Sequence, residues 1–154
     1  MPLQVTVGHA SLTGPRERNE DFCGVATPVG LELENKGVIA AVADGIGGHK
    51  GGREAAEYTV RGLLADYYAT PDTWGVPRAI ETVATALNRW VIAEAGRNAQ
   101  LSGMATTLSA IVLRGRRYTI AHVGDSRIYL LRDGQLKRLT VDHVWEHPEL
   151  HNVL

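Results

Sequence analysis

An uninterrupted apolar run, Val-Ile-Ala-Ala-Val-Ala at residues 38–43, stops abruptly at Asp44-Gly45. The run is too short for an ordinary helix and lacks polar alternation, which predicts a strand buried on both faces of a sheet. An ionised carboxylate at the end of such a strand is costly unless a cation or hydrogen bonds compensate it. The fold must therefore cover a sheet on both sides and also accommodate Asp44.

The segments before this run favour extended structure. Residues 3–10 alternate like a half-buried strand, and residues 22–27 form a short second strand segment. Residues 11–19, between them, are charged and rich in turn-forming residues. Residues 28–36 are expected to be a hairpin connection that leads from the second strand into the apolar run.

Helical periodicity occupies the middle of the chain, and strand patterns return after it. Apolar residues recur at helical spacing over 56–67 and 80–91, on either side of a break at 71–77. Two hairpins follow, with turns at Arg-Gly-Arg-Arg and at Asp133-Gly134. Their expected strands are 107–113 with 118–123, and 127–131 with 135–139. This order predicts an α+β layered fold in a single domain, residues 1–154, and argues against alternating βαβ units.

Charge and cysteine content exclude several classes of function. The formal net charge of −1 gives no basic excess for binding nucleic acid or an anionic membrane. The single cysteine, Cys23, excludes an internal disulfide and a cysteine-based zinc site. The sequence has neither a signal-peptide pattern nor a run of about 18 apolar residues. We therefore expect a cytoplasmic protein, with no nucleic-acid partner and no membrane contact in this segment.

Three acidic clusters share one design, because each places an aspartate beside a glycine or a turn at a strand edge. They are residues 16–21, 42–49 and 122–127. Each cluster taken alone has an ordinary structural explanation, which the sequence leaves open. Asp44 can cap the next helix through a glycine-rich turn. Asn19 can belong to a simple turn, and Asp125 can occupy a favoured β-turn position.

Taken together, the clusters predict a site for divalent cations. Several ionised carboxylates cannot share one pocket unless cations compensate them. Carboxylates with a backbone carbonyl are the ligand set of Mg²⁺ or Mn²⁺ and not of zinc. The glycines that follow Asp44 let the backbone turn sharply and approach a ligand closely. A pair of such ions can activate a bridging water for attack on phosphorus. Arg16 adds a planar donor fork for phosphate oxygens.

At these residues the sequence resembles the type 2C, or PPM-type, metal-dependent protein serine/threonine phosphatases in their bacterial form. The matching motifs follow the family order along nearly the whole chain. They are Arg16 with Asn19-Glu20-Asp21, then Asp44–His49, Gly103–Leu108, Val123–Arg127 and Leu139–His143. Each motif alone is weak evidence, but their order and separations are specific. The resemblance implies an αββα fold, in which antiparallel helix pairs flank a β-sandwich.

The resemblance also implies which residues hold metal. Asp44 would bridge two Mn²⁺ or Mg²⁺ ions, and Gly45 would contribute its carbonyl oxygen. Glu20 and Asp21 would hold the second ion, partly through water. Asp125 would help to hold a third, weaker ion.

Arg16 would bind the substrate phosphate, so Arg16 and Asp44 are the expected catalytic residues. The implied reaction is hydrolysis of phosphoserine and phosphothreonine on proteins by direct attack of water, without a phosphoenzyme. The implied partners are phosphorylated proteins in signalling, either substrates of a serine/threonine kinase or the kinase itself.

Two departures from the family pattern affect these expectations. Ile46 stands where some members have a histidine that is a general-acid candidate, so that role has no counterpart at this position. The late metal-binding aspartates of the family also have no match before Leu154. We therefore expect the N-terminal portion of a phosphatase domain, incomplete at its C-terminus. The alternative is a truncated or catalytically silent phosphatase-like module that binds phosphoproteins.

Overall fold

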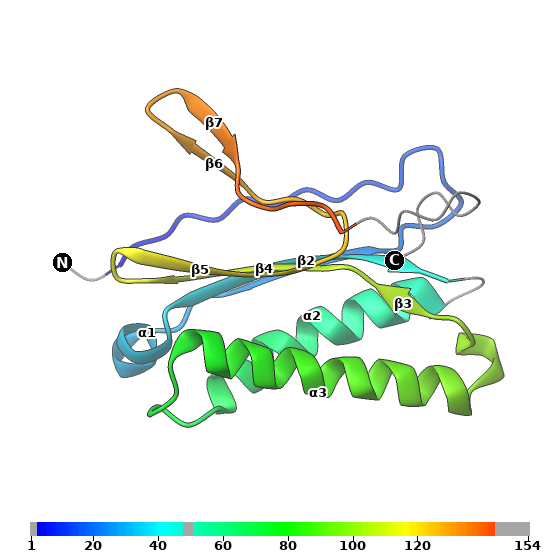
Figure 1. Cartoon of the computed structure of the whole chain (residues 1–154). Helices are drawn as coiled ribbons and strands as arrows, with labels where there is room; N and C mark the ends of the chain where they lie inside the picture. Colours follow the sequence, from blue (N-terminus) through cyan, green and yellow to red (C-terminus); the bar gives the residue numbers. More distant parts are fainter. Residues whose placement is uncertain (1–2, 48–50, 144–154) are drawn as a thin grey trace.

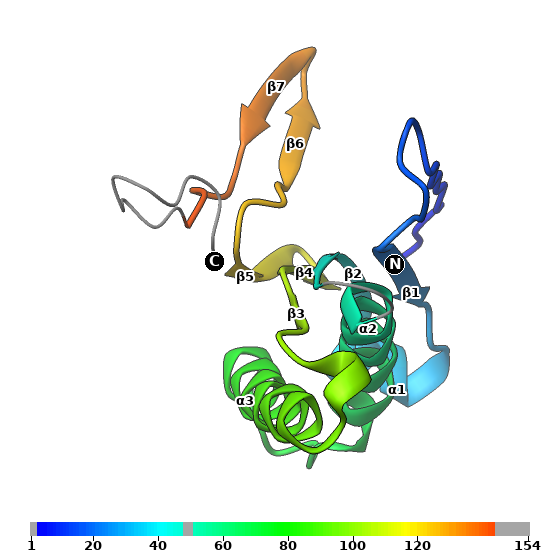
Figure 2. The same ribbon diagram turned by 90° about the vertical axis from the view of Figure 1, so that its right-hand side faces the viewer.

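The computed structural model describes residues 3–47 and 51–143. A five-stranded sheet is covered on one face by two long antiparallel helices, as Figure 1 shows. Figure 2 shows the N-terminal segment and a separate two-stranded hairpin on the opposite side of this sheet. The α+β class is confirmed, and the described residues supply one helix pair and one main sheet of the expected layers.

The sheet is antiparallel, and its strand order is β1-β2-β4-β5, with the short β3 paired to the end of β2. The bounds are β1 (Asp21–Ala26), β2 (Val38–Ile46), β3 (Ala105–Thr106), β4 (Leu108–Arg114) and β5 (Arg117–Val123). The separate hairpin pairs β6 (Tyr129–Arg132) with β7 (Gln135–Arg138). Its turn residues Asp133 and Gly134 have φ values of 52° and 74°, as a type I′ turn requires. Both predicted hairpins are confirmed.

The helix pair consists of α2 (Gly51–Ala69) and α3 (Val76–Arg97), which confirms the predicted break between them. Pro77 lies at the start of α3, where its fixed φ suits a helix and its missing N–H costs nothing. The main core lies between these helices and the sheet and includes Ile39, Val60, Leu63 and Val112. A short 3-10 turn, η1 (Ala99–Leu101), leads on to β3. No helix in the described part of the chain has the length and apolar character needed to span a bilayer.

Strand β2 is buried on one face along most of its length, so the prediction of a strand buried on both faces is wrong; on the other face Val38, at the start of the strand, is buried but Val42 is not. Ala41 and Ala43 are 3% and 2% exposed, whereas Val42 between them is 43% exposed. The helices cover the alanine face, and no helix among the described residues covers the other. Asp44 lies on the same exposed face as Val42, so desolvation at the end of a fully buried strand does not explain its site.

Two predictions for the N-terminal third are also wrong. Residues 3–10 form no strand, because no strand among the described residues pairs with them and alternation alone does not supply a ladder. Residues 28–36 contain the helix α1 (Gly30–Lys36) in place of a plain hairpin connection. Leucine, glutamate and lysine in this segment favour a helix. Gly37, with φ of 79°, ends it by donating its N–H to the carbonyl of Leu33.

Lys36, the last residue of α1, is only 2% exposed. Its Nζ donates to the carbonyl oxygens of Thr70 and Pro71, each at 2.9 Å, and to the hydroxyl of Thr70 at 2.7 Å. The hydroxyl of Tyr67 donates to the carbonyl of Lys36 at 2.7 Å. The short helix is therefore anchored to the end of α2 by a buried ammonium group whose partners are oxygens.

Replacing Lys36 with methionine should lower the free energy of unfolding by about 2 kcal/mol, because it leaves backbone carbonyls without their donor. Lys137→Met is the matched control: Lys137 is exposed on β7, and its replacement should change stability by less than about 0.5 kcal/mol. Urea unfolding of both variants measures the difference. Equal stability for Lys36→Met and the parent chain would show that the anchor contributes nothing.

Candidate functional site

The register of β1 against β2 brings two of the acidic clusters together. Asp21 lies directly opposite Asp44 in this antiparallel pair. Glu20 immediately precedes β1, and its carbonyl accepts a hydrogen bond from the N–H of Gly45 at 3.2 Å. The third cluster reaches the same place because Asp125 follows β5 across the end of the sheet.

A pocket of about 650 Å³ lies at this end of the sheet, and all of the predicted site residues line it. These residues are Arg16, Glu20, Asp21, Asp44, Gly45 and Asp125. The structure therefore gathers the predicted arginine, carboxylates and carbonyl residue from three distant stretches of chain, and Arg18 also lines the pocket. His49, in the second motif, lies outside the described residues.

Asp44, among the carboxylates of the pocket, has a perturbed pKa. Partial burial raises the pKa of Asp44, and the facing carboxylate of Asp21 raises it further through repulsion and a side-chain contact. Asp125 and Glu20 add smaller repulsive contributions to the raised pKa. The negative charges of the other three carboxylates therefore all act on Asp44. A divalent cation in the pocket would relieve this repulsion.

The backbone of Asp44 is held on both sides by a pair of threonines. Its N–H donates to the hydroxyl oxygen of Thr107 at 2.9 Å. Its carbonyl accepts from the N–H of Thr107 at 2.9 Å and from the hydroxyl of Thr106 at 3.1 Å. The backbone from which the Asp44 side chain projects is thus held by residues of the glycine-threonine motif, 62 and 63 positions away.

The first cluster is also held by residues whose role the sequence did not indicate. The side-chain oxygen of Asn19 accepts from the N–H of Asp21 at 3.0 Å, and its amide donates to the hydroxyl of Ser11 at 2.8 Å. The guanidinium of Arg53, on the first turn of α2, donates to the carbonyl of Asp21. Sequence analysis placed Asn19 in the first motif but assigned it no contact, and it missed Arg53, because neither contact follows from local patterns.

Glycines allow the start of α2 to approach the end of β2 very closely. A methyl group at Gly45 would overlap the carbonyl oxygen of Gly52, and one at Gly52 would come within 3.0 Å of the Glu20 carboxylate. The Glu20 carboxylate therefore lies against the N-terminal turn of α2, where the helix dipole favours negative charge. These glycines therefore allow β2 and α2 to pack backbone to backbone beside the pocket.

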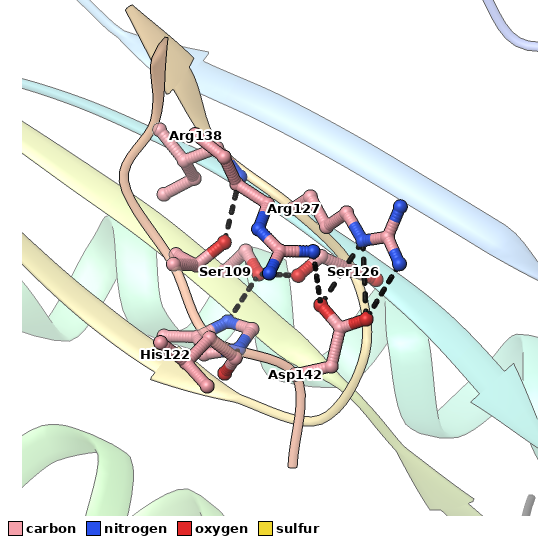
Figure 3. Close-up of polar contacts among 9 residues, drawn as sticks. Ser109, His122, Ser126, Arg127, Arg138 and Asp142 are labelled. Carbon is pink, nitrogen blue, oxygen red and sulfur yellow. Dashed lines mark hydrogen bonds and ion pairs between the residues drawn. The ribbon is translucent and has the colours of Figure 1, made fainter. Parts of the chain in front are cut away.

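Residues of the fifth motif, Leu139–His143, hold the loop that carries Asp125. Arg127 donates to both carboxylate oxygens of Asp142 at 2.6–3.2 Å, and these hydrogen bonds lower the pKa of Asp142. The N–H of His143 donates to the carbonyl of Gly124 at 2.8 Å. Figure 3 shows Arg127 and Arg138 reaching Asp142 beside Ser126. The Leu139–His143 motif thus secures the segment on either side of Asp125.

The donor set fits Mg²⁺ or Mn²⁺, because it consists of carboxylates and a backbone carbonyl and the carboxylates repel one another. Within residues 3–47 and 51–143, no three Asp, Glu, His or Cys side chains alone are arranged to hold an ion. A bound ion would therefore require further ligands, such as the Gly45 carbonyl and water. The residues that would hold ions surround the pocket, and Arg16 lies on its wall.

Comparisons with known proteins agree with this geometry. Residues 16–151 match the protein phosphatase 2C family. The serine/threonine phosphatase stp of Listeria innocua is 38% identical over 139 residues, which cover 88% of this chain and 53% of that protein. The phosphatase PstP of Mycobacterium tuberculosis is 37% identical over 106 residues, covering 68% of this chain and 20% of that protein. The chain spans about half the length of the Listeria relative.

Solved structures of serine/threonine phosphatases are also similar to this chain. The phosphatase Stp1 from Staphylococcus aureus has a TM-score of 0.76 at 28% identity, covering 88% of this chain and 52% of that one. The catalytic domain of PstP, solved in complex with 2 manganese ions, has a TM-score of 0.68 at 33% identity. That similarity covers 84% of this chain and 52% of the PstP chain.

Proposed function

This chain belongs to the protein phosphatase 2C family, and from this premise we propose that it carries part of the active site of a metal-dependent protein serine/threonine phosphatase. The substrates would be phosphoserine and phosphothreonine on proteins, including substrates of a serine/threonine kinase or the kinase itself. The manganese ions in the structure of PstP support metal dependence.

One observation carries this proposal. Glu20, Asp21, Asp44 and Asp125 line a single pocket together with Arg16. An ordinary turn or helix cap would explain one of these carboxylates. It would not explain why all four line one pocket, where burial and repulsion between them raise the pKa of Asp44. Converging carboxylates supply hard oxygen ligands for Mn²⁺ or Mg²⁺. Arg16 in the same pocket adds the donor geometry that phosphate oxygens prefer.

Each residue has a proposed role. Asp44 would be shared by two divalent ions, and the carbonyl of Gly45 and the carboxylates of Glu20 and Asp21 would supply further ligands, partly through water. Asp125 contributes to a third, weaker site. Bound divalent ions would lower the pKa of a bridging water and direct it at phosphorus.

Arg16 would orient the phosphate of the substrate through paired N–H donors. With Asp44 it forms the proposed catalytic pair. Water would attack phosphorus directly, so no residue of this chain would carry the phosphoryl group.

The test is a calorimetric titration of the chain with Mn²⁺, followed by an assay with a phosphothreonine peptide. Saturable Mn²⁺ binding and Mn²⁺-dependent phosphate release would support the phosphatase. Mn²⁺ binding without turnover would favour the alternative, a truncated or catalytically silent module that binds phosphoproteins. Turnover that is independent of metal would contradict the proposed mechanism.

Replacing Arg16 with alanine should raise KM for the peptide roughly tenfold, because a charge-assisted contact to phosphate is lost. The affinity for Mn²⁺ should stay unchanged, since Arg16 is no metal ligand in this proposal. Arg116→Ala is the matched control, because Arg116 is exposed at the β4–β5 turn and does not line the pocket. Steady-state kinetics and calorimetry on both variants check this. An unchanged KM in Arg16→Ala would remove Arg16 from the site.

A further inference from the structure

Ser126, the residue that follows Asp125, is held by two hydroxyl groups from the start of β4. The hydroxyl of Thr107 lies 2.8 Å from the hydroxyl of Ser126. The hydroxyl of Ser109 donates to the carbonyl of Ser126 at 3.2 Å, a contact drawn in Figure 3. Thr107 and Ser109 are two positions apart in extended chain, so their side chains point to the same face. Both are buried, at 1% and 2% exposure.

Thr107 differs from Ser109 because its hydroxyl also contacts the other side of the pocket. The same oxygen accepts the N–H of Asp44 at 2.9 Å. A hydroxyl has one proton and two lone pairs, so it can accept from Asp44 and still share a hydrogen bond with Ser126. One buried oxygen therefore connects the residue that carries the Asp44 carboxylate to the neighbour of Asp125.

We propose that Thr107 is a positioning residue, which sets the separation of the Asp44 and Asp125 carboxylates across the pocket through this shared hydroxyl. The inference rests on the proposed function, in which these carboxylates hold divalent ions. Partners behind metal ligands fix ligand orientation, and their loss weakens metal binding. The Thr107 hydroxyl contacts the backbone of one proposed ligand, Asp44, 63 residues before it, and Ser126, 19 residues after it, which adjoins the other ligand.

Loss of the bridge should leave the fold in place. The Asp125 loop keeps the contact from Ser109 to the Ser126 carbonyl and the contact of His143 with Gly124. The backbone of Asp44 keeps the hydrogen bond from the N–H of Thr107, which no side-chain replacement removes. What changes is the position of one carboxylate relative to the other, and metal affinity is the property that depends on it.

The experiment compares Thr107→Val, which keeps the shape and removes the hydroxyl, with Thr107→Ser, which keeps the hydroxyl. Calorimetric titration with Mn²⁺ should show affinity about tenfold lower for Thr107→Val. Thr107→Ser should restore most of it. Ser126→Ala removes the same hydrogen bond from the other side and should give a similar loss, which decides the question if Thr107→Val does not fold. Thr59→Val, at a buried threonine on α2 outside the pocket, is the matched control and should bind Mn²⁺ normally.

The outcomes separate this inference from the function on which it rests. Normal Mn²⁺ affinity in Thr107→Val and Ser126→Ala, with binding by the parent chain intact, would overturn the positioning role and leave the metal site standing. Lower stability of the metal-free variants in urea, with unchanged affinity, would assign Thr107 a merely structural role and also overturn it. A parent chain that binds no Mn²⁺ would overturn both proposals.

Discussion

Replacing Asp44 with asparagine should lower the affinity for Mn²⁺ by more than about a hundredfold, beyond the loss typical of a partner behind the ligands. Asp44 faces Asp21 across the β1–β2 pair, and Asp125 and Glu20 also act on its carboxyl. Asparagine keeps the size of the side chain and removes the charge that two ions would share. Peptide turnover that depends on Mn²⁺ should disappear with the binding.

The same substitution should not destabilise the metal-free chain. Partial burial, and then repulsion from the neighbouring carboxylates, raise the pKa of Asp44 in the folded state above its ordinary value. The ionised form is therefore less favourable in the folded chain than in the unfolded one at neutral pH. A neutral asparagine removes this penalty, so urea unfolding without metal should show equal or greater stability. Opposite changes in metal binding and metal-free stability are the signature of a site built for cations.

Asp133→Asn is the control for this prediction. Asp133 lies in the β6–β7 turn with φ of 52°, a conformation that asparagine also tolerates, and it does not line the pocket. Mn²⁺ affinity and stability should both match the parent chain in this variant. Mn²⁺ binding by Asp44→Asn at the parent affinity would contradict the assignment of Asp44 as a ligand.

The parts of the fold that were predictable are those with local causes. The helices α2 and α3 follow from apolar spacing on one face, and the β6–β7 hairpin follows from Asp133-Gly134. Residues 3–10 were predicted wrongly because strand formation needs a partner that the local pattern does not reveal. Helix α1 was missed because it is short, and contacts of Lys36 with Thr70 and Pro71 anchor it from a distant part of the chain.

The candidate site also has features with local causes, which were predictable, and features that depend on distant contacts, which were not. Its carboxylates could be proposed from the sequence because each stands beside glycine or a turn and the motifs occur in family order. The reason given for Asp44, a strand buried on both faces, was wrong, since its face of β2 is exposed. The register that sets Asp21 opposite Asp44 and the Thr107 bridge depend on pairing between distant segments. Local patterns contain no information about either contact.

Gly45→Ala should lower the free energy of unfolding by about 3 kcal/mol, at the upper end of the usual range for overpacking. The added methyl group would overlap the carbonyl oxygen of Gly52 and come within 2.9 Å of the carbonyl oxygen of Glu20. Both neighbours are backbone atoms, which cannot move aside as a flexible side chain can. Relief of the overlap must therefore separate the start of α2 from β2, and it would displace Glu20 and the Gly45 carbonyl from the pocket.

Gly96→Ala provides the matched control for Gly45→Ala. Gly96 is exposed near the end of α3, and a methyl group there meets no atom within 4 Å. That replacement should raise stability by about 0.5–1 kcal/mol, because alanine is a better helix former than glycine. Urea unfolding of the two variants should therefore give changes of opposite sign. A Gly45→Ala variant as stable as the parent chain would mean that β2 and α2 are not packed backbone to backbone, and the geometry of the pocket would then have to be abandoned.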